Sequence, residues 1–305
     1  VASAGIVLSA SKAKAKDSSE IATIAKEITV QVFGPASSGS GVIVKKEGNV
    51  YTVLTARHVI KAVEIGDEVE IQTSDGNFYS FDQGSIKPIK DEEIDLAVFT
   101  FQSEKSYQQA TIGKTNKVTS GNTVYVSGFP IATSSVNQSV WRFLKGDVIA
   151  NSSIQIKDGY QLLYSNPTLP GMSGGSVLDK NGKLIAIHGR SEKDDEVSNK
   201  TGKAISTGTN QAIPIKYYNL FINNKNIKIE SDKKLTADDY LVEAYNLIGS
   251  GDNLKILQLT KKVLTEKPES SLAYTLRGYA KSGLGDGVGA KADYNQALKI
   301  NPNIE

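Results

Sequence analysis

The sequence contains no cysteine, and among its 305 residues there are only two histidines, one methionine and one tryptophan. Without cysteine, neither a disulfide framework nor a cysteine-ligated metal site is possible. Two histidines offer no cluster for a transition-metal centre. No apolar run approaches the roughly 20 residues that a membrane-spanning helix needs. We therefore expect no metal, no cofactor and no stable membrane span in this chain.

The chain also lacks an excess of charge of either sign. Its 35 Lys and Arg residues nearly balance 33 Asp and Glu residues, which gives a net charge of +2 at pH 7. This balance gives no reason to expect nucleic acid as a partner. Hydrophobic residues make up 39% and charged residues 22%, as in ordinary globular proteins. The length is enough for about two domains.

The N-terminal residues 1–27 are predicted to form a leader followed by a short helix. Residues 1–15 contain a short apolar run and two small-x-small sequences, which are typical of signal-peptide cleavage sites. Asp17 and Glu20 have the spacing of a helix-capping box before an apolar helical pattern. We expect an exported bacterial protein that is periplasmic, lumenal or secreted. A plain N-terminal extension is the alternative.

Short apolar runs rich in Val, Ile, Thr, Tyr and Phe dominate the middle of the chain. They include residues 28–33, 41–44, 50–54, 69–72, 96–101, 123–126, 160–164, 175–178 and 184–188. Turn sequences lie at residues 47–49, 74–77 and 180–183. Many short strands at this spacing predict a β-barrel or β-sandwich. The pattern of residues 215–222 then predicts one closing helix.

The C-terminal part of the chain has a helical pattern that repeats. Gly251 recurs as Gly285 and Pro268 recurs as Pro302, so that the period is 34 residues. With small residues where two helices would cross, this pattern resembles the tetratricopeptide repeat. We expect two such repeats at residues 236–305 and a possible protein partner bound to them. A helical cap without any ligand is the alternative.

Three polar residues stand where a predicted strand meets a turn. His58 follows an apolar strand, and Asp95 precedes another, a costly place for an unpaired carboxylate. Ser173 lies among glycines in residues 171–175, where the backbone must turn sharply and can direct its amides at a developing oxyanion. Each residue alone also fits a structural role. Phosphate binding by the glycine-rich turn is disfavoured because the Walker spacing is absent.

The order His58, Asp95 and Ser173 is that of the chymotrypsin family. Several segments resemble successive motifs of bacterial trypsin-like peptidases, and the likeness extends over roughly residues 28–222. These segments are residues 37–60, 95–97, 128–130 and 171–175. The resemblance implies two six-stranded barrels with the catalytic triad at their interface.

The resemblance also implies the activity of a serine endopeptidase on protein or peptide substrates. Ser173 would attack the scissile carbonyl, His58 would act as general base, and Asp95 would orient the imidazole. The backbone N–H groups of Gly171 and Ser173 would form the oxyanion hole. The alternative is a catalytically inactive scaffold of the same fold that binds protein partners through its repeats.

The segment around the second histidine resembles that of glutamyl endopeptidases. In that branch a histidine on this strand and a threonine near the serine loop receive an acidic side chain, and the matching residues are His188 and Thr168. Gly189 and Arg190 follow on the same strand, and Arg190 would add a positive charge. Pro167 stands where trypsin-like specificity needs an aspartate. We expect an acidic P1 residue, with a small or aliphatic residue as the alternative.

The sequence therefore predicts an all-β double six-stranded barrel of chymotrypsin type followed by a small all-α helical-repeat domain. The predicted division is a leader and short helix at 1–27, a trypsin-like serine peptidase at 28–222, a linker at 223–235, and two tetratricopeptide-like repeats at 236–305. No PDZ-like segment follows the barrels in this sequence. This argues against a typical quality-control protease of the HtrA type.

Overall fold

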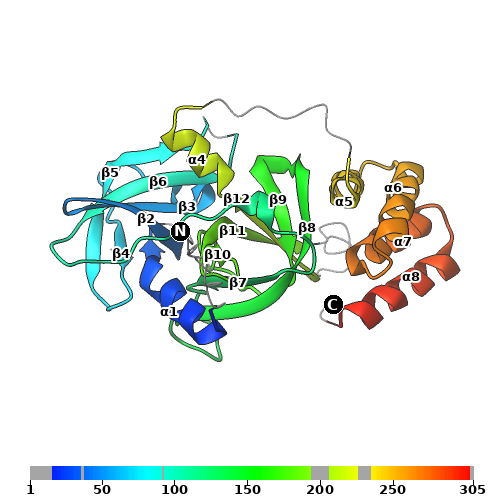
Figure 1. The fold of residues 1–305 in the computed structure, drawn as a ribbon, viewed down its shortest axis with the longest axis horizontal. Coiled ribbons are helices and arrows are strands. Elements are labelled where there is room, and N and C mark those ends of the chain that lie inside the picture. The colour runs from blue at the N-terminus through cyan, green and yellow to red at the C-terminus, as the bar shows by residue number, and fades with distance from the viewer. Residues whose placement is uncertain (1–15, 36–37, 91–92, 194–205, 226–234, 303–305) are drawn as a thin grey trace, which may run out of the picture.

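The structure is a computed structural model, and it describes residues 16–35, 38–90, 93–193, 206–225 and 235–302. The predicted leader at residues 1–15 and most of the predicted linker lie outside these described residues. Within them, two β-barrels lie side by side, and a group of helices adjoins the second barrel (Figure 1).

The first barrel is a closed antiparallel sheet of six strands in the order β1-β2-β3-β6-β5-β4. Alternate side chains such as Val53 and Phe99 point inward and are fully buried, as the two-residue period of a strand requires. Its strands are β1 (Thr29–Phe33), β2 (Ser38–Glu47), β3 (Val50–Ala56), β4 (Glu70–Gln72), β5 (Phe78–Pro88) and β6 (Leu96–Gln102). The short helix α2 (Arg57–Ile60) follows β3 directly.

The second barrel is also closed, with six antiparallel strands in the order β10-β11-β12-β9-β8-β7. Leu162, Val177 and Ile185 belong to its buried core. Its strands are β7 (Thr123–Gly128), β8 (Arg142–Ile156), β9 (Tyr160–Tyr164), β10 (Ser176–Leu178), β11 (Leu184–Lys193) and β12 (Ser206–Pro214). Two short 3₁₀ helices, η1 (Thr115–Lys117) and η2 (Lys157–Gly159), lie before β7 and before β9.

Helices frame the barrels at both ends of the chain. Helix α1 (Ser18–Ile28) begins with the predicted capping box of Asp17 and Glu20, and it buries Ile21 against the barrels. Helix α4 (Lys216–Ile222) follows β12, the last strand of the second barrel, where the sequence predicts a helix. The C-terminal helices are α5 (Ala237–Asn246), α6 (Asn253–Glu266), α7 (Ser271–Gly283) and α8 (Gly287–Ile300).

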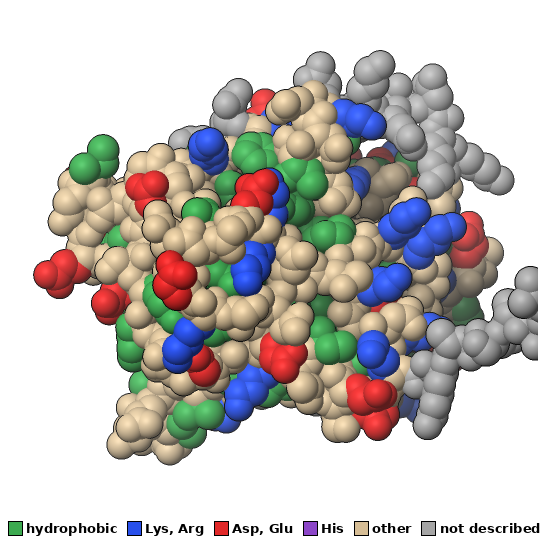
Figure 2. All heavy atoms as spheres, turned by 60° about the vertical axis from the view of Figure 1, so that its left-hand side comes forward, with side chains coloured by type: hydrophobic (Ala, Val, Ile, Leu, Met, Phe, Trp, Pro, Cys, Tyr) green, Lys and Arg blue, Asp and Glu red, His purple; other side chains and the backbone are tan. Residues whose placement is uncertain are grey.

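The predicted fold class is confirmed, because two closed six-stranded antiparallel barrels precede a region of several helices. The helices α5 to α8 lie on the side of the second barrel that faces away from the first (Figure 1). Basic and acidic side chains are mixed over the face drawn in Figure 2, in keeping with the balanced charge of the sequence. Within the described residues, no helix combines the length and the apolar character needed to cross a membrane.

Candidate active site

His58 and Asp95 are brought together by the pairing of β3 with β6. In this antiparallel pair Ala56, the last residue of β3, lies opposite Leu96, the first residue of β6. His58 follows in α2 and Asp95 precedes β6, so both side chains leave the same edge of the sheet. The Nδ1 atom of His58 lies 2.7 Å from Oδ2 of Asp95, and the backbone N–H of His58 donates to Oδ1 at 2.9 Å.

The surroundings of Asp95 keep it ionised. Burial alone would raise the pKa of this carboxyl group. The hydrogen bond and charge of His58, followed by the hydroxyl group of Tyr160, outweigh burial and hold the pKa of Asp95 below its ordinary value. An ionised carboxylate fixed on Nδ1 of an imidazole leaves Nε2 free to accept a proton.

The loop that carries Ser173 is tied to the first barrel through β2. The backbone N–H of Ser40 donates to the carbonyl oxygen of Ser173 at 2.8 Å, and the Ser40 hydroxyl donates to the carbonyl of Gly171 at 3.1 Å. At Gly174, where φ is +87°, a Cβ atom would overlap the carbonyl oxygen of Ser40. The position therefore requires glycine on both steric and conformational grounds.

The Ser173 hydroxyl donates a hydrogen bond to the carbonyl oxygen of Gly189 at 2.8 Å. In the part of the chain that the structure describes, it has no hydrogen bond to the imidazole of His58. Within the same described residues, the backbone N–H groups of Gly171 and Ser173 have no acceptor in the protein. Two unpaired amides beside a serine hydroxyl are available to an incoming oxyanion.

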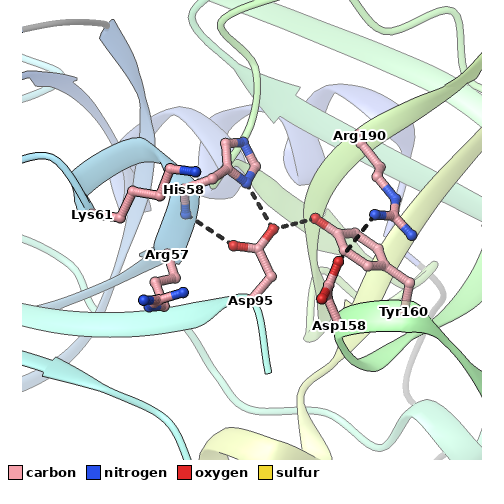
Figure 3. Close-up of a pocket in the computed structure, with 7 residues that line it drawn as sticks. All are labelled: Arg57, His58, Lys61, Asp95, Asp158, Tyr160 and Arg190. Atoms are coloured by element: carbon pink, nitrogen blue, oxygen red, sulfur yellow. Dashed lines mark hydrogen bonds and ion pairs between the residues drawn. The ribbon is translucent and has the colours of Figure 1, made fainter. Parts of the chain in front are cut away.

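A cavity of about 390 Å³ opens beside the His58–Asp95 pair, as Figure 3 shows. Basic and acidic side chains line it together with one aromatic ring. The lining residues are Arg57, His58, Lys61, Asp95, Asp158, Tyr160 and Arg190. Among the described residues, no group of three or more His, Asp or Glu side chains is arranged to hold a metal ion.

His188 lies inside the second barrel, and Thr168 is half-buried on the loop that follows β9. His188 is fully buried, and its Nδ1 lies 2.5 Å from the hydroxyl of Tyr164. Burial and the charge of His58 lower the pKa of His188 to about 3, so its ring is neutral at neutral pH. The Thr168 hydroxyl donates to Oδ1 of Asn210 at 2.5 Å. Both side chains thus have protein partners already.

Arg190 occupies a different place from these two residues. Its Nε donates to Oε1 of Gln211 at 2.9 Å, and its guanidinium forms an ion pair with Asp158 at 3.3 Å. It lines the cavity described above, and neither Thr168 nor His188 does. Of these predicted specificity residues, only Arg190 therefore lies at the cavity beside His58, and Asp158 matches much of its charge.

Two residues at the site were missed in the sequence. Ser40 connects the first barrel to the serine loop, and Tyr160 donates a hydrogen bond to Asp95 at 2.6 Å. Ser40 lies within residues 37–60, which carry the family resemblance, so the sequence could have indicated that it lies near the site. Tyr160 is only the first residue of a predicted strand, and no pattern in the sequence indicates that it reaches the other barrel.

The fold and the site define a class. Two antiparallel six-stranded barrels, with a histidine–carboxylate pair on one and a glycine-embedded serine on the other, have the architecture of chymotrypsin-like serine peptidases. Comparison with known families agrees, because residues 39–187 match the model of the trypsin-like peptidase domain. The matched segment includes His58, Asp95 and Ser173.

The chain is similar to bacterial proteins that are named serine proteases. A "Serine protease HtrA-like" of Staphylococcus epidermidis is 32% identical over 158 residues, which are 49% of this chain and 26% of that protein. The "Serine protease Do-like HtrA" of Bacillus subtilis is 25% identical over 185 residues, 59% of this chain and 38% of the relative. A relative from Staphylococcus aureus is 30% identical over 159 residues, 49% of this chain and 19% of its own length.

The chain thus spans well under half the length of these relatives. The family match runs from β2 into β11 and leaves out β1, β12 and the C-terminal helices. The prediction against a typical HtrA-type protease rested on the residues after the barrels. The family match ends at residue 187 and leaves that prediction untested. The peptidase domain itself is similar to proteins that carry the HtrA name.

Proposed function

We propose that this protein is a serine endopeptidase in which His58, Asp95 and Ser173 form the catalytic triad. The observation that carries the proposal is the 2.7 Å contact of His58 Nδ1 with an ionised Asp95, on the barrel that also anchors the serine loop. This contact holds the imidazole in the orientation and tautomer that a general base needs. The sequence similarity of residues 39–187 supports the same roles.

Catalysis requires one rearrangement of the geometry described above. The Ser173 hydroxyl turns from the carbonyl of Gly189 to Nε2 of His58, which takes its proton as Oγ attacks the scissile carbonyl. The backbone amides of Gly171 and Ser173 then donate to the oxyanion, and each such donor contributes about 3 kcal/mol to transition-state stabilisation. His58 passes the proton to the leaving amine, and water hydrolyses the acyl-enzyme.

Labelling with a fluorophosphonate probe tests this proposal. We expect the wild-type protein to be labelled covalently, Ser173→Ala to give no label, and His58→Ala to label at least about a thousand-fold more slowly. Ser106→Ala, which removes an exposed hydroxyl that bonds to Lys46, is the matched control and should label normally. Circular dichroism checks that each variant is folded.

An unlabelled but folded wild type would contradict the proposal. It would favour the alternative of an inactive scaffold that binds partners through its C-terminal helices. Labelling that persists in Ser173→Ala would mean that another residue is the nucleophile.

For the substrate we propose a peptide with an acidic P1 residue, received by His188 and Thr168. In the tautomer in which the Tyr164 hydroxyl donates to Nδ1, the neutral ring of His188 carries its proton on Nε2 and can donate a hydrogen bond to a carboxylate. The Thr168 hydroxyl would turn from Asn210 to the same carboxylate. Arg190 contributes little to this preference, because Asp158 and Gln211 already bind its guanidinium.

A set of peptides that differ only at P1 tests this preference. We expect kcat/KM to be highest for Glu, with Asp next, and lower for Gln, Ala and Leu. Thr168→Val should lower kcat/KM for the Glu peptide by about ten-fold, as expected for one lost hydrogen bond to a charged group. The same variant should leave the Ala and Leu peptides nearly unchanged. A wild type that prefers Ala or Leu would establish the small or aliphatic alternative instead.

We further propose that the C-terminal helices form two tetratricopeptide-like repeats that dock a protein partner or substrate. Helices α5 and α7 begin at Ala237 and Ser271, and α6 and α8 begin at Asn253 and Gly287, which is 34 residues apart in each case. This spacing supports the repeat predicted from the sequence. We also propose export from a bacterial cell, on the basis of the leader-like residues 1–15, which lie outside the described residues.

A further inference from the structure

Tyr160 approaches the candidate triad from the second barrel. It is fully buried, and its hydroxyl donates to Oδ2 of Asp95 at 2.6 Å. The same oxygen lies 2.7 Å from Nδ1 of His58, while Oδ1 accepts the backbone N–H of His58. The carboxylate is therefore held by three donors, and one of them comes from the other barrel (Figure 3).

The ring of Tyr160 is held in place on both sides. The guanidinium carbon of Arg190 lies 4.0 Å from the ring centroid, and Arg190 is anchored by its ion pair with Asp158. The backbone of Asp158 in turn accepts the N–H of Asp95 at 2.9 Å. Gly189, the neighbour of Arg190 on β11, leaves the space that the ring fills, because a Cβ atom there would lie 2.5 Å from two ring carbons.

The hydroxyl of Tyr160 can serve only as a donor to this carboxylate. Burial, followed by the negative charge of Asp95, raises the pKa of Tyr160 far above its ordinary value, so that the phenol stays protonated at any working pH. A protonated phenol against an ionised carboxylate is a charge-assisted hydrogen bond. The bond fixes the carboxylate plane, and it draws negative charge away from the oxygen that faces His58.

We propose that Tyr160 is a positioning residue for the catalytic carboxylate, and that the Arg190–Asp158 pair holds its ring for this role. The inference rests on the proposed triad and goes beyond it, since it makes the orientation of Asp95 depend on both barrels. A shift of the second barrel against the first would break this hydrogen bond before it disturbed the His58–Asp95 contact. The base is then correctly oriented only when the barrels are correctly docked.

The test is Tyr160→Phe, which removes one oxygen and keeps the ring. Without the hydroxyl the carboxylate of Asp95 is less firmly oriented. Its oxygens also keep more of their negative charge, which stabilises the imidazolium of His58 more strongly. We expect the plateau rate constant of fluorophosphonate labelling to fall by roughly ten-fold. The midpoint of the acidic limb of its pH profile should move by about half a unit toward higher pH.

The other charged groups around the pair stay the same in this variant. They are Arg57 from α2, Lys61 at the end of α2, Asp158 from η2 and Arg190 from β11. Tyr217→Phe is the matched control, because it removes a buried hydroxyl that accepts a hydrogen bond from the neutral Gln155 at 2.5 Å. We expect it to change neither the plateau nor the midpoint.

A second measurement keeps the inference independent of activity. The chain has only two histidines, and His188 is buried, so NMR of the imidazole rings can follow the titration of His58 alone. In Tyr160→Phe the titration midpoint of His58 should move to higher pH. An unlabelled wild type would refute the proposed function, and the NMR titration would still decide the role of Tyr160. A midpoint that matches the wild type in both measurements overturns the inference, even if the plateau rate falls.

Discussion

At the residue scale, Gly189 shows how one position serves both the nucleophile and the base. Its carbonyl oxygen accepts the Ser173 hydroxyl, and its lack of a side chain admits the ring of Tyr160. A methyl group at this position would overlap the Tyr160 hydroxyl, which contacts Asp95. Any larger residue at 189 therefore displaces the ring that holds the carboxylate.

The substitution Gly189→Ala should therefore destabilise the protein and slow the labelling of Ser173. We expect a loss of about 1–3 kcal/mol in the free energy of unfolding, as for other overpacked cores. Labelling of Ser173 should slow by at least about ten-fold, since the hydrogen bond to Asp95 is lost as well. Thermal unfolding and labelling kinetics measure the two effects. The control is Gly287→Ala, because a Cβ atom there meets open space. It should change neither the free energy of unfolding nor the labelling rate. Wild-type labelling in Gly189→Ala would disprove the steric argument.

Single residues also show how much of the site could be predicted from the sequence. His58, Asp95 and Ser173 stand out in the sequence because each interrupts a local pattern at the end of an apolar strand or among glycines. The pairing of β3 with β6 is regular, so the 2.7 Å contact of His58 with Asp95 follows from strand register. The contact of Tyr160 does not, since it joins residues from two barrels and depends on how they dock.

At the element scale, turns and buried strands were easier to predict than long, exposed strands. The turn sequences at residues 47–49, 74–77 and 180–183 do connect β2 to β3, β4 to β5 and β10 to β11. Strand β12 was not picked out, although it is largely buried, and neither were β5 and β8, the longest strands. Many of their side chains are exposed, and register shifts interrupt their pairing with β6 and β9. Both features blur the two-residue period that identifies a strand.

At the scale of the whole molecule, the helical region is fixed to the second barrel by carboxylates of α5. Asp239 accepts hydrogen bonds from the backbone and hydroxyl of Ser153 on β8, at 2.7 and 2.8 Å. Asp238 accepts the backbone N–H of Asn151 at 3.0 Å and pairs with Lys267 from α6. The sequence predicted the helices, because their apolar period is local. It gave no sign of this docking, since aspartates in the first turn of a helix are already expected as caps.

The last prediction concerns this docking and its dependence on pH. Burial would raise the pKa of Asp239, but donors from Thr236 and then Ser153 lower it well below its ordinary value of 3.8. A group with a lowered pKa in the folded state stabilises that state fully above its unfolded value, and this contribution is lost as the pH falls toward the folded value. In the wild type, protection of α5 to α8 from hydrogen exchange should therefore weaken below about pH 4.

Asp239→Asn should weaken the same protection already at pH 7, by about 1–3 kcal/mol, because the bonds from Ser153 lose their charge. Thr236 still caps α5, and the amide oxygen of an asparagine at position 239 can still accept the backbone N–H of Thr236, so the loss reports docking rather than helix formation. Asp252→Asn changes the N-cap of α6, which is exposed, and is the matched control. The barrels should keep their protection in both variants, and labelling of Ser173 should be unchanged, since Asp239 bonds to Ser153 and Asp252 to the backbone of α6 rather than to residues of the candidate active site. Equal protection of α5 to α8 in Asp239→Asn and Asp252→Asn would mean that apolar packing against β8, and not this carboxylate, holds the two parts together.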